Sequence, residues 1–429
     1  MSHRSHLLLG TAATALLATV ACSSASSSNG FNRGGATGGS GGQGGNLFDN
    51  EAGVGGSGGG ILPSEPPCNP TDPSADSDGD GWTTAGGDCN DCTAQMNPGA
   101  FDYANNGVDE DCNGTPDDEP TGCDQGLAIE GNSAMDAAKS LGLCRVAQGE
   151  SWGVVSATWS AADGTKGHAY ADTSGLFGGG CDSTDGYPSA RGHGLLPKFG
   201  KAIKPRQGAS MLALSSGTAR EGTNGESPAG DTLCTQSNVP PAPFAPKTAT
   251  GCNVPLAPDY VANDVSALEI VIKTPTNANS FSFAFDFYTY EWPDYVCSQY
   301  NDYFAVILQS NHPKTPADHN ISFDSQGNPV SVNNGLVQVC DPQMGLSGPG
   351  GKTFSCPLGT GELAGTGFEK HAASSWLQTK APVVPGETIH LRFAVWDMGD
   401  EFLDSTVVID DFAWDVAEGT EPTTVPIPK

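Results

Sequence analysis

The chain of 429 residues is rich in glycine and strongly acidic, with 19 lysines and arginines against 49 aspartates and glutamates and a formal charge of −30. Contacts to phosphates need a basic footprint, so this balance argues against a nucleic-acid partner and favours cation binding. The length leaves room for two or three domains.

Residues 1–21 have the pattern of a secretion signal. Arg4 supplies a positive charge, and an apolar run from Leu7 to Ala21 precedes Cys22. This run is too short for a membrane span. Two interpretations stay open, namely ordinary cleavage after Ala21, or lipidation of Cys22 at a motif that resembles a bacterial lipobox. We expect lipidation, because a long tether follows, and with it a membrane partner and a place at the outer membrane or cell surface.

The composition divides the rest of the chain. Glycine, serine and then proline dominate the segment after Cys22, which predicts a disordered tether. An acidic segment follows, and a globular composition begins at Cys123. The predicted divisions are the signal peptide 1–21, the tether 22–67, the acidic segment 68–120, a β-sandwich 123–418 and a tail 419–429.

The acidic segment predicts a site for a hard cation. Between Asp72 and Glu119 it carries thirteen acidic residues and no Lys, Arg or His. Alternate aspartates on a tight glycine turn supply the oxygens that Ca²⁺ prefers. An EF-hand loop would place its closing glutamate at Gly87, so a later aspartate must complete the shell. The expected ligands are Asp76, Asp78, Asp80, the carbonyl of Trp82, Asp88, Asp91, Asp109 and Asp111. The alternative is a solvated, disordered acidic linker.

The cysteines indicate disulfides. Setting Cys22 aside leaves twelve, an even number, of which four lie in the acidic segment and eight after it. We favour a Cys89–Cys112 bond, because it would bring Asp88 and Asp111 together. Zinc binding by Cys89-x-x-Cys92 is the disfavoured alternative, since no histidine lies nearby.

From Asp76 through Asn97-Pro98-Gly99-Ala100 to Gly114, the acidic segment resembles the metal-binding motif of bacterial surface proteins and MopE-like proteins. The resemblance implies metal binding, and some members of that group are linked with copper. Copper prefers imidazole or sulfur ligands. Since the segment has no histidine, we expect structural Ca²⁺.

The globular region predicts one helix, from Asn132 as its cap to Leu143, and then strands. Apolar residues alternate strictly along Ser280–Tyr288 and Thr388–Trp396. Weaker alternation marks Leu268–Ile272, Phe304–Leu308 and Val407–Trp414. These patterns predict a mainly β fold with few short helices, an antiparallel, jelly-roll-like β-sandwich.

Two stretches, Pro275–Phe283 and Trp396–Phe412, are distinctive. Through them and other phrases, residues from about 123 to 416 resemble the choice-of-anchor L family of surface-protein domains, most strongly from Asn277 onward. The resemblance implies an extracellular β-sandwich without an established reaction.

Two further candidate sites lie in this region. A second Ca²⁺ could bind where loop acids meet, at Asp397, Asp400, Asp404 and Asp410; the alternative is that these aspartates cap turns. Trp292 and Tyr295 lie in an aromatic loop and are candidates for contact with a ligand, although buried aromatics are the commoner case.

No catalytic motif is present, so we expect a cell-surface lipoprotein that displays a non-catalytic adhesion or binding module. Its expected partners are the membrane, through the lipid anchor, and an extracellular glycan or protein. The alternatives are a carbohydrate-binding, lectin-like protein and a secreted hydrolase that uses aspartate or glutamate.

Overall fold

The computed structural model describes residues 70–149, 151–166, 168–169, 191–220, 233, 235–240, 249, 251–252, 261–343 and 352–428. All of them belong to the second of two compact units, Glu65–Lys429. The predicted signal peptide, Cys22 and the tether lie outside the described residues. No helix in the described ranges is both long enough and apolar enough to cross a membrane.

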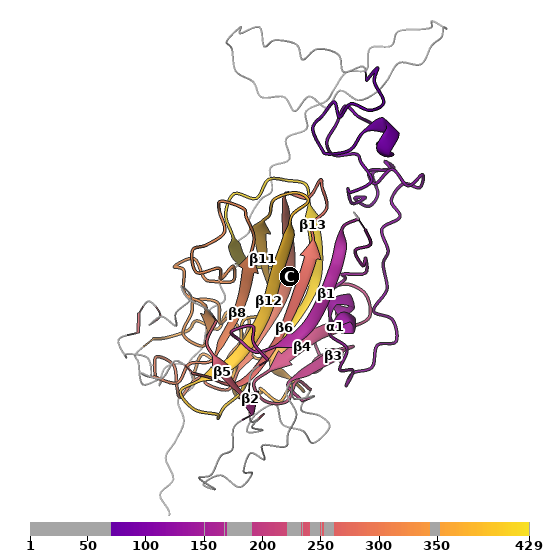
Figure 1. Ribbon diagram of the computed structural model, residues 1–429. Coiled ribbons are helices and arrows are strands. Elements are labelled where there is room, and N and C mark those ends of the chain that lie inside the picture. Colours follow the sequence, from indigo (N-terminus) through magenta and orange to yellow (C-terminus); the bar gives the residue numbers. More distant parts are fainter. Residues whose placement is uncertain are drawn as a thin grey trace, which may run out of the picture. The chain divides into compact units, whose positions relative to one another are not determined.

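Two antiparallel sheets face each other (Figure 1), which confirms the expected mainly β, sandwich-like fold. The first sheet has the order β2 (His168–Ala169), β5 (Thr235–Asn238), β6 (Val261–Lys273), β12 (Thr388–Met398), β8 (Tyr303–Gln309), β9 (Val330–Ser331), with β1 (Gly153–Ser160) also paired to β6. The second has the order β14 (Thr423–Pro426), β11 (Leu377–Pro382), β7 (Ser280–Thr289), β13 (Ser405–Asp415), β4 (Met211–Ser215), β3 (His193–Leu196), with β10 (Ala372–Ala373) paired to β7.

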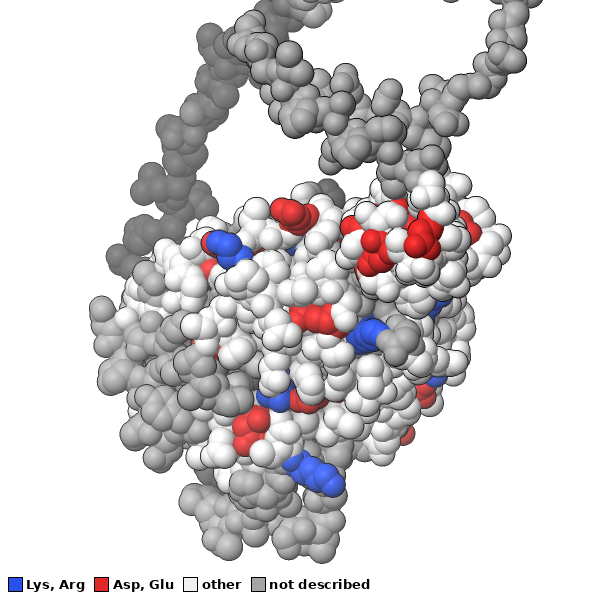
Figure 2. All heavy atoms as spheres, turned by 45° about the horizontal axis from the view of Figure 1, so that its top comes forward, with Lys and Arg blue, Asp and Glu red and all other residues white. Residues whose placement is uncertain are grey.

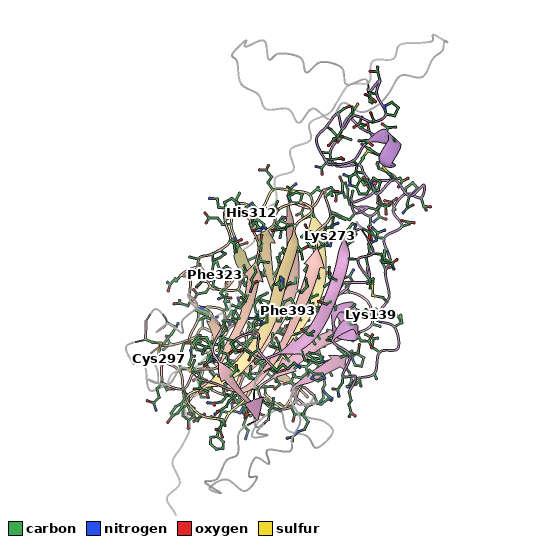
Figure 3. All side chains as sticks on the ribbon, in the orientation of Figure 1. Lys139, Lys273, Cys297, His312, Phe323 and Phe393 are labelled. Atoms are coloured by element: carbon green, nitrogen blue, oxygen red, sulfur yellow. A yellow bond between two sulfur atoms is a disulfide. The ribbon has the colours of Figure 1, made fainter. Side chains whose placement is uncertain are left out.

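The core lies between the sheets and follows the alternation seen in the sequence. Phe393 of β12 lies in the middle of the sandwich (Figure 3), and its ring meets Phe283 of β7 edge-on with centroids 5.1 Å apart. The alternating apolar residues of these two strands are all at most 1% exposed: Phe281, Phe283, Phe285, Phe287, Ile389, Leu391, Phe393 and Val395. Two long strands thus bury one face each against the other sheet.

The outer face of the second sheet is also covered. Tyr288 of β7 packs against Phe199 and Phe368, which come from segments outside the strands, and all three are fully buried. A short 3₁₀ helix, η3 (Gly361–Leu363), lies in one of these covering segments. Burial on both faces leaves little polar surface on this sheet.

The helix is shorter than the sequence indicates. α1 spans Ala134–Ser140, and Ser133 rather than Asn132 caps it, since its side chain accepts a hydrogen bond from Asp136 N. The amide oxygen of Asn132 instead lies 3.0 Å from His193 Nε2. A tertiary contact with β3 therefore removes the predicted cap, and the helix begins two residues later than predicted.

A bulge in the first sheet prepares one of the candidate sites. The pairing of β6 with β12 steps from Ser266–Val395 to Asn263–Asp397, so that Asp264 and Val265 together oppose Trp396. Asp264 has φ of +47°, a left-handed conformation that is uncommon for a residue with a side chain.

The acidic segment contains one short 3₁₀ helix, η1 (Thr84–Gly86), and docks on the sandwich at the end of β6. Asn277 is fully buried; its Oδ1 accepts a hydrogen bond from Phe101 N at 3.0 Å, and its Nδ2 donates to Phe101 O at 2.9 Å. Trp152 Nε1 donates to Ala100 O at 2.6 Å, and the Trp152 ring packs against Phe101. The stretch Asn97–Phe101 therefore serves as the docking strip of the segment.

Disulfides support both regions. Cys89–Cys112 forms inside the acidic segment, as predicted, with the two Cα atoms 5.6 Å apart. The sandwich region contains Cys123–Cys144, Cys252–Cys297 and Cys340–Cys356. Cys92 is also disulfide-bonded, which argues against its use as a zinc ligand.

Replacing Asn277 with alanine tests the docking contact. The substitution leaves the N–H and C=O groups of Phe101 buried without a partner, so we expect the free energy of unfolding to fall by about 2–4 kcal/mol. Denaturant unfolding measures this loss. The exposed Asn311→Ala is the control, and an equal effect of the two substitutions would contradict the docking role.

Candidate metal centres

Carboxylates of the acidic segment converge at two overlapping groups. Asp76, Asp78 and Asp80 each offer an oxygen within 4.8 Å of the others, and so do Asp78, Asp88 and Asp91. This spacing is the diameter of a Ca²⁺ coordination shell, in which each ligand lies about 2.4 Å from the ion. Asp78 belongs to both groups, so the five residues form one continuous set. We call this set the loop cluster.

In three aspartates of the loop cluster, one carboxylate oxygen makes a local hydrogen bond and the other makes none with the described residues. Oδ1 of Asp78, Asp80 and Asp88 accepts a hydrogen bond from the backbone N–H two residues further on, at 3.3, 2.7 and 2.7 Å. Oδ2 of each is buried without a hydrogen-bond partner among the described residues. Local turns thus fix the side chains and leave one oxygen of each available to a cation.

Without a cation, the surroundings of the loop cluster disfavour the ionised form of its carboxyl groups. The pKa of Asp80 is raised to about 6, chiefly by burial and to a smaller extent by the neighbouring carboxylates of Asp78 and Asp88. Burial is likewise the largest cause that raises the pKa values of Asp78 and Asp88. A bound cation would reverse this effect, because it stabilises the charged form of each ligand.

Figure 2 shows acidic side chains gathered on one part of the described surface, with no basic side chain among them. The sequence of the acidic segment accounts for this, because Asp72–Glu119 contains no lysine or arginine. The surface potential there attracts cations before any ligand is engaged.

Two predicted ligands lie outside the loop cluster. Asp109 accepts hydrogen bonds from the backbone N–H groups of Asn113 and Gly114, at 3.1 and 2.8 Å, and so caps a turn. Asp111 joins Asp102 and Asp118 in a separate group. The Cys89–Cys112 bond therefore does not bring Asp111 into the set that contains Asp88.

Arg145, from the sandwich side of the chain, supplies positive charge to this separate group. Its guanidinium lies 2.9 Å from Asp111 Oδ2 and 3.4 Å from Glu119 Oε1, and it stacks on the Trp152 ring at 4.8 Å. Burial raises the pKa of Glu119 to about 7, and Arg145 opposes that rise. The negative charge around Asp111 is thus compensated by a side chain of the protein itself, the guanidinium of Arg145.

A third group is buried in the sandwich. Asp264, Asp397 and Asp404 each offer an oxygen within 4.8 Å of the others, and all three are fully buried. Asp264 comes from the bulge in β6, Asp397 from the end of β12, and Asp404 directly precedes β13. We call these three residues the core cluster. The sequence singled out Asp397 and Asp404 but missed Asp264, whose partner in the fold is 133 positions away.

Two more buried carboxylates adjoin the core cluster. Asp302, directly before β8, accepts a hydrogen bond from Ser405 Oγ at 2.7 Å. Glu291, after β7, is 1% exposed and its Oε2 has no hydrogen-bond partner among the described residues. Burial is the largest cause that raises the pKa well above its ordinary value for four of these carboxyl groups: Asp264, Glu291, Asp302 and Asp397.

The other two predicted second-site residues differ. Asp400 lies at the rim, half-buried, where its Oδ1 accepts a hydrogen bond from Phe402 N at 3.2 Å. Asp410 lies in β13 beyond reach of the core cluster, and its Oδ2 accepts hydrogen bonds from the backbone N–H groups of Arg206 and Gln207. Asp410 therefore anchors a loop more than 200 positions away, whereas the alternative raised from the sequence was the capping of a local turn.

The predicted ligand-contact residues are mostly enclosed. Trp292 is fully buried and packs in a satellite cluster with Val296 and Phe354. Tyr295 is half-buried and meets Tyr300 edge-on at 5.7 Å. The Trp292 ring has no free face for a sugar in this conformation. A separate groove of about 510 Å³, lined by Gln309, His319 and His390 among others, includes neither residue.

The fold and its strand-end acids define a disulfide-braced β-sandwich with buried carboxylate groups. Residues 212–414 match the family model of the Choice-of-anchor L domain. The match begins in β4, ends in β13 and indicates a surface-associated, β-rich module. It includes the whole core cluster and excludes the acidic segment. Comparison with curated proteins and with solved structures gave no significant match.

The ion pairs of Arg145 can be tested by Arg145→Met, which keeps the packing of the stem on Trp152. Asp111 is only 6% exposed, so its carboxylate loses a buried partner. We expect the free energy of unfolding to fall by about 3 kcal/mol. Chemical denaturation measures the change. Lys139→Met removes a half-exposed pair with Asp136 on one face of α1 and should cost less than about 1 kcal/mol; equal losses would refute the role assigned to Arg145.

Proposed function

We propose that this protein is an exported, lipid-anchored surface protein in which a calcium-braced acidic segment carries a non-catalytic β-sandwich that binds an extracellular partner. The observation that carries the calcium part is the division of oxygens in Asp78, Asp80 and Asp88. Each uses Oδ1 to fix its own turn and leaves a buried Oδ2 unpartnered among the described residues. Three such buried oxygens within the loop cluster favour an ion over a solvated linker.

Calcium is the cation best suited to the loop cluster. All five residues are aspartates, and hard cations prefer oxygen ligands. The cluster offers enough carboxylate oxygens for a flexible shell of six to eight, whereas Mg²⁺ usually keeps several waters and takes one or two carboxylates. Asp88 and Asp91 supply the closing side of the shell that a glutamate supplies in an EF-hand.

A bound cation would stabilise an acidic segment that cannot form a hydrophobic core of its own. Its apolar residues are too few to form a core of their own, and Phe101 packs on the sandwich rather than within the segment. Around Asp76–Asp91 the chain consists mainly of turns, with one 3₁₀ helix, η1. A cation at the loop cluster would bind these turns together, as metals do in other small domains.

A binding role for the sandwich is favoured over catalysis and over glycan stacking. Glu291 and Asp397, the carboxylates considered for hydrolysis, are 1% and 0% exposed. Trp292, the aromatic candidate for a sugar, is equally buried. The surface-associated module matched at residues 212–414 supports display outside the cell. The proposal also includes attachment of the chain to a membrane through a lipid on Cys22.

The double substitution Asp80→Asn with Asp88→Asn tests calcium binding by the loop cluster. Removing two ligand charges should weaken binding at this site by about 100-fold or more. Calorimetric titration of the chelator-treated protein with Ca²⁺ measures the affinity. In the unsubstituted protein, Ca²⁺ should also slow cleavage after Trp82 by a protease specific for aromatic residues.

Asp72→Asn is the control, because it removes one carboxylate charge from the same segment, and Asp72 only caps an exposed turn at Ser74. This variant should bind Ca²⁺ as the unsubstituted chain does. Equal binding by the control and the double variant would refute the loop cluster as the site. Cleavage after Trp82 that is indifferent to Ca²⁺ would refute the bracing role.

A further inference from the structure

The core cluster sits where the ends of strands from both sheets meet. Asp264 and Asp397 belong to β6 and β12 of the first sheet, and Asp404 leads into β13 of the second. The acidic segment docks beyond Lys273, at the other end of β6. Asp264 and Lys273 are nine positions apart along the strand, which is about 30 Å. Figure 3 shows Lys273 and Cys297 towards opposite ends of the sandwich.

The negative charge here has no matching positive charge. Asp264, Asp302, Asp397 and Glu291 form no ion pair with any lysine, arginine or histidine in the described part of the chain. Arg145 forms an ion pair with Asp111, but no basic side chain of the described residues forms one with these four carboxylates. Several buried like charges without a counter-ion are costly, so either protons or a cation must neutralise them.

The orientation of the carboxyl groups favours a cation. Asp264 and Asp397 are fully buried, and none of their four carboxylate oxygens forms a hydrogen bond of ordinary geometry with a described residue. Donors close by, the backbone N–H groups of Leu233 and Thr235 for Asp264 and the Ser216 hydroxyl for Asp397, offset only part of the effect of burial on the pKa of each carboxyl group. Glu291 Oε2 is a further buried oxygen without a hydrogen-bond partner among the described residues, and its charge interacts with those of Asp302 and Asp404. Protonation would neutralise these groups, but each neutral carboxyl would still bury an O–H donor and a carbonyl oxygen that need partners, whereas one cation can take an oxygen from each group.

The backbone brings the Asp264 side chain into this position. The bulge in β6 inserts one extra residue opposite Trp396, and Asp264 takes the left-handed conformation there. Glycine or asparagine would be the ordinary choice at such a position. Aspartate is one of the few residues with a side chain that tolerates this conformation, and here its carboxylate joins Asp397 and Asp404.

We propose that Asp264, Asp397 and Asp404 hold one buried calcium ion that fastens the two sheets together at the end of the sandwich opposite the acidic segment. Three carboxylates whose oxygens lie within 4.8 Å of one another fit one Ca²⁺ shell. Glu291 provides a further oxygen from the loop after β7. Asp302 remains hydrogen-bonded to Ser405 and supports the shell from behind.

This ion is independent of the one proposed at the loop cluster. The two sites share no residue and lie at opposite ends of β6, so either can fail without the other. The core ion is enclosed by fully buried ligands, and it should therefore exchange slowly and resist brief chelation. The loop ion, held partly by the exposed Asp76, should exchange fast.

The first test counts ions in the Asp80→Asn, Asp88→Asn variant, which lacks the loop site but keeps the sandwich intact. After removal of loosely bound metal on a calcium-free column, elemental analysis should find one Ca²⁺ per chain. Unfolding in chelator and refolding with Ca²⁺ should raise the thermal midpoint by about 5 °C over refolding without it. No retained calcium together with an unchanged midpoint would overturn the proposal, whatever the result at the loop cluster.

The second test adds Asp397→Asn to that variant. The retained ion should be lost, and the midpoint should become independent of Ca²⁺. Asp286→Asn is the matched control, because Asp286 is equally buried but is hydrogen-bonded to Tyr288 Oη and Ser374 Oγ. The control should lower the midpoint and still retain one ion. If Asp397→Asn does not fold, the ion count of the first test decides alone; retention of calcium by a folded Asp397→Asn chain would contradict the assigned ligands.

Discussion

Negative charge taken out of water beside other negative charge is the constraint on which this molecule depends. A buried carboxylate costs several kcal/mol unless a cation or a set of donors compensates it, and the structure gathers such groups at three places. Around Asp111 the compensation is internal, since Arg145 reaches across from the sandwich. At the loop cluster and the core cluster, no lysine, arginine or histidine of the described residues forms an ion pair with Asp80 or Asp397. The same physics therefore gives one ion pair and two candidate cation sites.

The sandwich makes this arrangement possible because it fixes strand ends rigidly. Long strands such as β6 and β12 bury an apolar face along their length and carry Asp264 and Asp397 near one end. At one end Asn277 holds the docking strip of the acidic segment by its amide. At the other end Asp397 and Asp404 meet across the two sheets. A charge cluster can persist there because the hydrophobic core holds its members in place.

Sequence reasoning reached the fold through local signals. Strict alternation around Phe283 and Phe393 predicted the two facing strands, and turn chemistry predicted that Asp78 and Asp80 would point to one site. It failed where a tertiary contact decided the outcome. Asn132 contacts His193 instead of capping the helix. Asp264 joins the core cluster because of a β-bulge that no local sequence pattern reveals.

The aspartates near the end of the chain show the same limit. Asp404 and Asp410 look alike in sequence, as acids beside one apolar strand. Only the sheet pairing places Asp404 with Asp264 and turns Asp410 toward the loop at Arg206. Similarly, the sequence predicts Asn97–Phe101 as part of a metal-binding motif. In the structure this strip docks the acidic segment, and Phe101 packs on the sandwich. Spacing along the chain identifies candidate ligands, but long-range pairing selects among them.

Calcium at both sites would link folding to the compartment in which the protein works. A chain whose buried carboxylates lack their ions carries uncompensated charge at both ends of the sandwich, and so it is less stable until the ions bind. Extracellular modules commonly bind Ca²⁺ with dissociation constants of about 10⁻⁴–10⁻³ M, a range suited to free calcium outside cells. Disulfides such as Cys89–Cys112 depend on the same compartment, because they persist where the surroundings are oxidising. Both braces would therefore become effective after the export that we propose, when the acidic segment must withstand proteases without a large core of its own.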